Sequence, residues 1–353
     1  MRIPSARIHA LTQLRRGLLA ALVGGLACAA VPAQAAEKLT IMVGGINKII
    51  YLPAKLTEAL GYFKDEGLDV ELQSQPAGVD AENQLIAGAV QAVVGFYDHT
   101  IDLQSKGKEI EAIVTFAKVP GEVELVSKNA TDSLKSMADA KGKTFGVTGL
   151  GSSTDFLTRY LALRAGVQSK DFSLLPVGAG ATFIAAMQQK RIDAGMTTEP
   201  TVAQMLKTGD AKVLVDLRDE ANTVKALGGL YPAASLYVQN AWAAGHAAEA
   251  TKLAHAFART MAYLHTHTPE QIAELMPRDY YGADKALYIE ALKSSLPMFT
   301  TDGRMPAGGP ENVLKVLASF KPQIKPQNID LSDRKSTRLN SSHTDISRMP
   351  SSA

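Results

Sequence analysis

Apolar and polar positions alternate between two periods along most of the chain. Short strand-like runs are followed by longer segments in which apolar residues recur every three or four positions, and glycines mark many of the connections. This succession is typical of parallel α/β folds, in which a helix follows each strand and packs on the sheet. The runs that predict strands are 39–43, 68–72, 92–96, 110–116, 123–126, 144–148, 174–177, 192–196, 212–216 and 234–239.

The helix-like segments lie between these runs. A helical face beginning at Leu52 ends at Gly61, and Asp80 is expected to cap the next helix. After Gly228 the character changes, because one strand is followed by long helices that we expect to pack on the first lobe. The other predicted helices are 100–106, 153–165, 182–190, 199–207, 242–265, 269–276, 285–296 and 310–320.

The length of 353 residues exceeds what one compact core of ordinary size needs, so two α/β lobes are expected. The chain is predicted to cross between them near Gly121 and again near Gly228. Lobe 1 then comprises 37–121 and 229–331, lobe 2 comprises 122–228, and a ligand cleft lies between them.

Both ends carry segments that we exclude from the fold. Residues 1–36 have the pattern of a signal peptide, with arginines, an apolar run over 17–31 and a small-residue cleavage site. The pair Arg15 and Arg16 would suit a twin-arginine signal, but the general Sec route is favoured, and the residues before Cys28 do not suit a lipid anchor. Residues 332–353 contain seven serines and no apolar periodicity, and resemble translated adapter sequence, so the native C-terminus is expected to be missing.

Excluding both ends changes the charge balance. The remaining body has 29 Lys and Arg against 33 Asp and Glu, so its net charge is near −4 and no basic patch indicates nucleic acid as a partner. The single cysteine is Cys28 in the leader. The exported body therefore has no disulfide, no thiolate nucleophile and no cysteine ligand for a metal.

A continuous part of the chain resembles a known family. The run from Tyr51 to Leu72 reads YLPAKLTEALGYFKDEGLDVEL, and the likeness continues through GSST at 151–154, MQQKRIDA at 187–194 and Glu199-Pro200. These segments resemble the nitrate, sulfonate, taurine and thiamine-precursor family of periplasmic binding proteins. The resemblance implies a type II periplasmic-binding-protein fold and a monomer without catalytic residues or cofactor. It also implies that a bound solute is passed to ABC permease and ATPase subunits.

Ligands of open α/β sheets bind beyond the carboxyl ends of the strands, which directs attention to the segments after 43, 96, 148 and 196. The segment Gly151, Ser152, Ser153 and Thr154 precedes a helix, where amides, hydroxyls and the helix dipole favour an anion. Plain capping of that helix by Ser152 or Ser153 explains the same residues.

Three other strand ends offer candidate ligand contacts. Tyr97 and Asp98 follow one strand, although Asp98 could instead cap the next helix and His99 could be exposed. Gly45 and Asn47 follow another strand, where a simple turn would also explain the glycine. The last pair consists of Thr198 and Glu199, and Glu199 could instead begin the next helix.

These candidates combine carboxylates with an anion-binding helix start. A zwitterion would satisfy both, whereas a sulfonate, carboxylate or nitrate would need only the hydroxyls and amides. The catalytic signatures of serine hydrolases, P-loop enzymes and zinc proteases do not occur. Two alternatives stay open: a thiamine-pyrimidine binding protein or biosynthetic enzyme, and a periplasmic sensor subunit.

Overall fold

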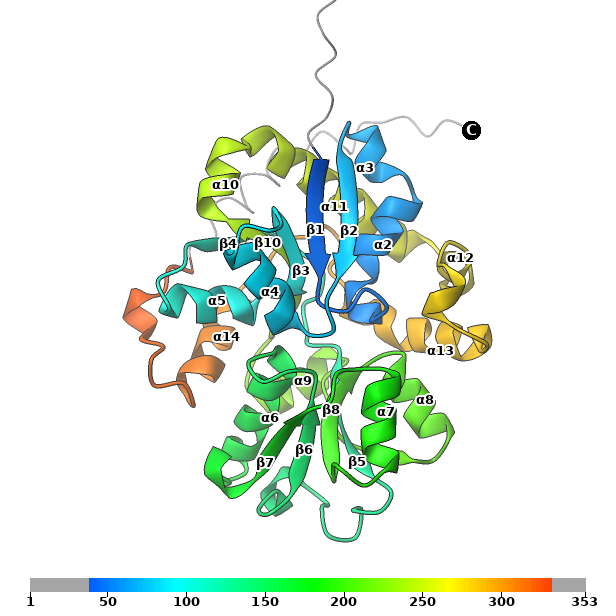
Figure 1. Ribbon diagram of the computed structural model, residues 1–353, viewed down its shortest axis with the longest axis vertical. Helices are drawn as coiled ribbons and strands as arrows, with labels where there is room; N and C mark the ends of the chain where they lie inside the picture. The colour runs from blue at the N-terminus through cyan, green and yellow to red at the C-terminus, as the bar shows by residue number, and fades with distance from the viewer. Residues whose placement is uncertain (1–37, 332–353) are drawn as a thin grey trace, which may run out of the picture. The chain divides into compact units, whose positions relative to one another are not determined.

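Two five-stranded sheets form the framework of the computed structural model, which describes residues 38–331 (Figure 1). The predicted signal peptide and the predicted foreign tail lie outside the described residues. We call each sheet with its helices a lobe. The sheet of lobe 1 has the order β2 (Asp69–Ser74), β1 (Lys38–Val43), β3 (Ala92–Phe96), β10 (Ala234–Gln239) and β4 (Ile110–Thr115). The sheet of lobe 2 has the order β7 (Ser173–Pro176), β6 (Thr144–Val147), β8 (Ala194–Thr198), β5 (Glu122–Ser127) and β9 (Ala211–Asp216).

The two sheets share one topology. In lobe 1, β1 pairs in parallel with β2 and β3, and β10 is antiparallel to β3 and β4. In lobe 2, β6 pairs in parallel with β7 and β8, and β5 is antiparallel to β8 and β9. The antiparallel strands β5 and β10 are the first strands after each crossing of the chain. Every run that the apolar pattern predicted as a strand overlaps an observed strand, so those predictions are confirmed.

The helices depart from the sequence prediction in several places. The predicted helix over 242–265 is two helices broken at His246, and α9 was not predicted. Asp80 was predicted to cap α4 but lies inside its first turn, and the N-cap is Ala77. The observed helices are α2 (Leu52–Ala59), α3 (Tyr62–Asp65), α4 (Gly78–Ile86), α5 (Asp98–Ser105), α6 (Ser153–Arg164), α7 (Ala181–Gln188), α8 (Thr201–Lys207), α9 (Glu220–Leu227), α10 (Asn240–Gly245), α11 (Ala247–Thr266), α12 (Pro269–Glu274), α13 (Lys285–Ser295) and α14 (Gly309–Ala318). Short 3-10 turns occur at η2 (Ile49–Tyr51), η3 (Met137–Asp139), η4 (Ser169–Asp171), η5 (Arg278–Tyr280), η6 (Leu296–Met298) and η7 (Pro326–Asn328).

The C-terminal helices contact both lobes, whereas the sequence predicted that they pack on lobe 1 alone. α11 packs on α2, α3 and β4 of lobe 1. However, α13 also contacts α8 of lobe 2, and α14 lies against both α5 and α6. Beyond α14, the ring of Phe320 lies 6.2 Å from that of Phe156 on α6. The C-terminal segment therefore contacts elements of both lobes, and Phe320 adds an aromatic contact to lobe 2.

Two neighbouring segments connect the lobes. The chain passes to lobe 2 between β4 and β5 and returns between β9 and β10. The two segments bond to each other, since the Gly121 amide donates to the Leu217 carbonyl at 3.0 Å and the Ala233 amide donates to the Ala117 carbonyl at 2.9 Å. Gly121 has a φ of +65°, and a Cβ there would lie 2.5 Å from Met298 Sδ. This crossing therefore requires glycine both for its backbone conformation and for space.

None of the helices described over 38–331 is long and apolar enough to cross a membrane.

Candidate functional site

A small cavity lies where the loops at the carboxyl ends of the strands of the two lobes meet. Its volume is about 10 Å³ for the centre of a water molecule, which is room for a single water. Both lobes contribute to its wall. The lining residues are Lys48, Ile50, Tyr51, Gly78, Phe96, Glu122, Thr148, Ser152, Ser153, Thr154 and Thr198.

Hydrogen bonds across the lobes close this cavity. The Ile49 amide donates to the Glu199 carbonyl at 3.0 Å, and the Val79 amide donates to Ser152 Oγ at 3.3 Å. A third bond joins side chains, from Ser153 Oγ to Asp98 Oδ1 at 2.8 Å. The lobes must separate at these contacts before a solute larger than water can enter.

Lys48 supplies a buried cation to the cavity. Its ammonium donates to the carbonyl oxygens of Gly44 at 2.6 Å and Pro76 at 3.2 Å. Burial lowers the pKa of Lys48 to about 8. Gly45 makes room for this side chain, because its φ is +112° and a Cβ there would lie 2.5 Å from Lys48 Cε. Lys48 was not among the residues predicted from the sequence. Its place before two isoleucines, just after a predicted strand, is a signal that could have identified it.

Asp98 links the lobes next to the cavity wall, through its bond to Ser153. It is the first residue of α5, but its carboxylate does not cap that helix. It accepts hydrogen bonds from Ser153 Oγ and from Tyr231 Oη, both at 2.8 Å. Burial raises the pKa of Asp98 to about 6, and the two hydroxyl donors act against that rise. The capping alternative for Asp98 is therefore wrong.

His99 is fully buried, so the alternative in which it is exposed is wrong. Its Nδ1 lies 3.2 Å from Glu82 Oε2, and its Nε2 lies 3.4 Å from Ser153 Oγ. Burial lowers the pKa of His99 to about 3, so the ring is neutral near pH 7. Burial also raises the pKa of Glu82 to about 8.

Two glutamates of β5 were also missed by the sequence analysis. Glu124 Oε2 accepts a hydrogen bond from Thr158 Oγ1 at 2.8 Å, and burial raises the pKa of Glu124 to about 8. Glu122 lines the cavity with 3% of its surface exposed, and its Oε2 has no hydrogen-bond partner among the described residues. Burial raises the pKa of Glu122 well above its ordinary value.

The start of α6 brings four of the predicted residues to or beside the cavity. Ser152 occupies the N-cap position but makes no side-chain capping bond, so capping does not account for its hydroxyl. Ser153 and Thr154 also line the cavity, and the Thr154 hydroxyl accepts from the Thr148 amide at 3.0 Å. Gly151 has a φ of +90°, and its amide donates to Asp155 at 2.7 Å.

The remaining predicted residues are distributed differently. Thr198 lines the cavity, whereas Asn47 is exposed and Tyr97 is buried among apolar side chains of α5 and its neighbours. Glu199 is held by Arg218 at 2.8 Å and accepts from the Ala203 amide at 2.8 Å. Its carboxylate thus satisfies the first turn of α8, which begins at Thr201.

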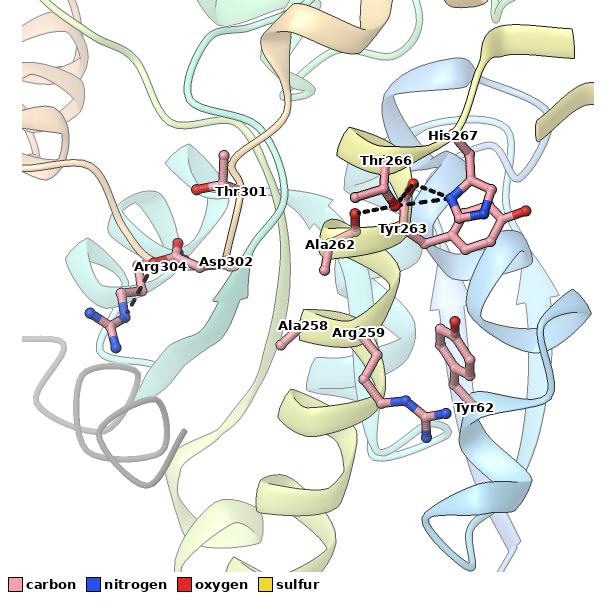
Figure 2. A pocket seen from close by; sticks show the side chains of 10 residues that line it. All are labelled: Tyr62, Ala258, Arg259, Ala262, Tyr263, Thr266, His267, Thr301, Asp302 and Arg304. Carbon is pink, nitrogen blue, oxygen red and sulfur yellow. Dashed lines mark hydrogen bonds and ion pairs between the residues drawn. The ribbon is translucent and has the colours of Figure 1, made fainter. Parts of the chain in front are cut away.

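A larger hollow of about 480 Å³ lies on lobe 1, away from these residues. Figure 2 shows Tyr62, Tyr263 and His267 on one side of α11 and Asp302 and Arg304 on the other. The Tyr263 and His267 rings stack at 3.5 Å, and Arg259 covers the Tyr62 ring at 3.9 Å while donating to Asp65. Because these polar groups bind one another on an open surface, the cavity between the lobes is the stronger candidate site.

No group of three or more His, Cys, Asp or Glu that could hold a metal occurs within 38–331. The ionisable groups of the cavity wall are the Glu122 carboxyl and the Lys48 ammonium, with hydroxyls beside them. Behind the wall, the Asp98 carboxyl and the neutral His99 ring contact Ser153. Such a set can bind a small polar molecule by hydrogen bonds and ion pairs once the lobes have parted.

Several solved structures are similar to this chain. A protein from Bordetella bronchiseptica RB50 is 32% identical, with 87% of this chain and 98% of that chain covered and a TM-score of 0.82. The alkanesulfonate-binding protein SsuA from Xanthomonas axonopodis pv. citri, bound to MOPS, is 16% identical, covers 83% and 95%, and has a TM-score of 0.66. The periplasmic nitrate-binding protein NrtA from Synechocystis PCC 6803 is 14% identical, covers 90% and 92%, and has a TM-score of 0.64.

One curated protein is also similar. It is the 4-amino-5-hydroxymethyl-2-methylpyrimidine phosphate synthase THI11 from Saccharomyces cerevisiae, 24% identical over 167 residues. The match covers 46% of this chain and 46% of the synthase, so it spans less than half the length of that relative.

The family and fold follow from these findings together. The two lobes, their shared sheet topology and the cavity between them match the periplasmic-binding-protein fold of the solved neighbours, which confirms the predicted type II architecture. The family model described as NMT1/THI5 like matches residues 51–272. The chain therefore belongs to the NMT1/THI5-like family.

Proposed function

We propose that this chain is the extracytoplasmic solute-binding component of an ABC importer and holds a small anionic or zwitterionic solute between its lobes. The observation that carries this proposal is the cavity between the two sheets, whose wall includes Lys48 together with Thr148, Ser152 and Thr198. An ammonium, hydroxyl donors and the start of α6 together favour a negatively charged group. Relatives named as alkanesulfonate-binding and nitrate-binding proteins support the same role.

The proposed cycle begins with separated lobes. The solute binds first to one lobe, and closure then brings the cross-lobe groups onto it and excludes water. Lobe 1 is proposed to comprise 37–121 and 229–331, and lobe 2 to comprise 122–228. The proposed ligand-binding residues are the predicted set with Lys48 added: Gly45, Lys48, Asn47, Tyr97, Asp98, Gly151, Ser152, Ser153, Thr154, Thr198 and Glu199.

The partners of this step lie outside the chain. We propose that a monomer, exported by the Sec route to the periplasm, delivers the solute to permease and ATPase subunits at the inner membrane. The receptor itself performs no chemical step, because ATP hydrolysis belongs to the partner subunits.

A second candidate function is a thiamine-pyrimidine binding protein or biosynthetic enzyme, for which the similarity to the yeast synthase is the specific support. Its ligand would be an amino-substituted ring. A periplasmic sensor subunit would use the same site and would differ in its docking partner.

A thermal-shift screen of the exported chain tests the proposal. The panel contains taurine, alkanesulfonates, nitrate, aromatic carboxylates, amino acids and aminopyrimidines. A ligand at one hundred times its dissociation constant stabilises the native state by about 2.7 kcal/mol. A shift with an anion or zwitterion supports the importer role, and turnover of an aminopyrimidine would replace it by the enzyme.

Two variants then locate the site. Ser152→Ala and Thr198→Ala each remove a cavity hydroxyl, and a lost hydrogen bond to a charged solute should weaken binding about 10-fold or more. The matched control is Thr251→Ala, which removes a hydroxyl that bonds only to Ala247 on α11. Equal affinities in all three variants, measured by titration calorimetry, would move the site away from the cavity.

A further inference from the structure

Glu122 stands apart from the other residues of the cavity wall. It is the one carboxylic side chain that lines the cavity, and it comes from β5 of lobe 2. Its Oε2 is buried and has no hydrogen-bond partner among residues 38–331. A buried carboxyl oxygen without a donor is costly, so a native protein that keeps one has a use for it.

Other buried acids of the protein have partners that Glu122 lacks. Glu199 is paired with Arg218, Asp98 accepts from two hydroxyls, and Asp102 is paired with Lys106 and Lys321. Glu122 has no ion pair among the described residues. Glu82 and Glu124 also each keep one buried oxygen without a hydrogen-bond partner, but neither side chain lines the cavity. Among the described residues, Glu122 is therefore the acid whose unpartnered oxygen belongs to the wall of the proposed ligand site.

The charged groups around Glu122 leave it short of positive charge. Asp98 and Glu124 both repel a negative charge on it, and Lys48 is the cation that attracts one. However, Lys48 already donates to the carbonyls of Gly44 and Pro76, both in lobe 1. A solute that brought a second positive charge to Glu122 would satisfy the carboxylate and reduce its repulsion with Asp98.

We propose that Glu122 binds a protonated amine of the transported solute, while Lys48 and the hydroxyls at the start of α6 bind its acidic group. The solute class is then a small amino acid or aminosulfonic acid rather than nitrate or an amine-free sulfonate. This inference rests on the proposed function, since it assigns one end of the solute to one residue of the same cavity.

The assignment has a measurable consequence for protons. Burial raises the pKa of Glu122 even with Lys48 nearby, which favours the neutral carboxylic acid until a second cation arrives. When an ammonium group binds, the carboxylic acid releases its proton to solvent and the carboxylate pairs with the ammonium. Binding of an amine-bearing solute should therefore release protons, whereas an amine-free anion should leave Glu122 protonated.

The test compares Glu122→Gln with Glu124→Gln by titration calorimetry in two buffers of different ionisation enthalpy. Gln keeps the shape of the side chain but cannot carry the charge. Glu122→Gln should lower the affinity for the amine-bearing solute about 10- to 100-fold and abolish proton release, because a hydrogen bond between charged groups is lost. Glu124→Gln changes the same strand away from the cavity wall, and should retain both the affinity and the proton release.

The outcomes separate this inference from the proposed function. Two results would show that Glu122 does not bind the amine, although the receptor role would stand. Amine-free anions would bind the wild type as tightly as their amine-bearing analogues, or Glu122→Gln would bind the amine-bearing solute as tightly as the wild type does. If no solute of any class binds the wild type, the proposed function itself is overturned. If Glu122→Gln does not fold, the affinities of the wild type for taurine and for N-acetyltaurine are compared instead. A loss of affinity of about 10-fold or more on acetylation would support the inference, and equal affinities would overturn it.

Discussion

Four buried carboxyls lie near the contact between the lobes: Glu82, Asp98, Glu122 and Glu124. None is paired with arginine or lysine within the described residues. Asp98 and Glu124 accept hydrogen bonds from hydroxyls, and Glu82 Oε2 lies 3.2 Å from His99 Nδ1. Burial raises the pKa of each. At the scale of residues, the protein therefore gives up stability to keep acidic groups buried near the contact between the lobes, and of these four only Glu122 lines the cavity.

This cost predicts a pH dependence of stability that Glu124→Gln should reduce. Burial raises the pKa of Glu124 from 4.5 to about 8, so between these values the native state binds more protons than the unfolded state. The free energy of unfolding from this group therefore falls as the pH rises through that window, by at most about 1.4 kcal/mol per pH unit. Removing the carboxyl should remove this contribution.

The measurement is urea unfolding of the wild type and of Glu124→Gln at pH 6.5 and 8.0. His99 acts in the opposite direction, because its lowered pKa adds stability as the pH rises, but only up to about 6.5. Lys48 also opposes the trend, mainly above pH 8, and is the same in both proteins. The difference between the two proteins in how the free energy of unfolding changes with pH gives the contribution of Glu124. Parallel pH profiles would show that the pKa of Glu124 is not raised.

At the scale of elements, the two connecting segments hold the lobes in register. They bond to each other through Gly121 and Leu217 and through Ala117 and Ala233. Gly121 lies against Met298 of η6 and Ile50 of η2, so the crossing is packed between elements of lobe 1. A side chain at this position would disturb both the backbone and the packing.

We expect Gly121→Ala to destabilise the protein by about 2–5 kcal/mol. The positive φ costs about 1–2 kcal/mol, and overpacking against Met298 Sδ at 2.5 Å adds about 1–3 kcal/mol. Gly166→Ala is the control, because its φ is +84° but no heavy atom lies within 4 Å of the added Cβ. Urea unfolding should show the control losing only the backbone part, and equal losses would mean that Met298 moves aside freely.

At the scale of the whole molecule, the lobes are closed on a cavity with room for about one water. Contacts across the lobes involve the loops after the strands, α8 with α13, and α6 with α14. The loop contacts involve residues of the cavity wall, so the proposed solute entry would break these first. The same contacts re-form around the solute in the proposed cycle.

Locking the lobes with a disulfide should abolish solute binding. A Cβ on Gly149 of lobe 2 would lie 3.0 Å from Ala77 Cβ of lobe 1. Disulfides usually have a Cβ separation of about 3.5–4.5 Å, so Ala77→Cys combined with Gly149→Cys needs a shift of about half an ångström. The only natural cysteine of the chain is Cys28, within the predicted signal peptide, so no other thiol of the exported body competes.

The expected result is that the oxidised double variant binds no solute and that dithiothreitol restores binding. Ala77→Cys alone is the control and should bind solute whether oxidised or reduced. Full binding by the oxidised double variant, with the cross-link verified by mass spectrometry, would mean that the solute enters without separation of the lobes at this point.

Chain length predicted the two lobes, and the apolar pattern predicted the ten strands and most helices, because local period carries that information. It also directed attention to the strand ends that supply Ser152, Ser153 and Thr198 to the cavity. Only the tertiary structure decided which polar residues meet there. Glu122 and Glu124 alternate with apolar residues, as on the solvent face of a half-buried strand, yet both are buried, since the opposite lobe and α6 cover that face. Lys48 faces the cavity and Asn47 faces solvent for the same reason: a loop's local sequence does not specify which side the second lobe will close upon.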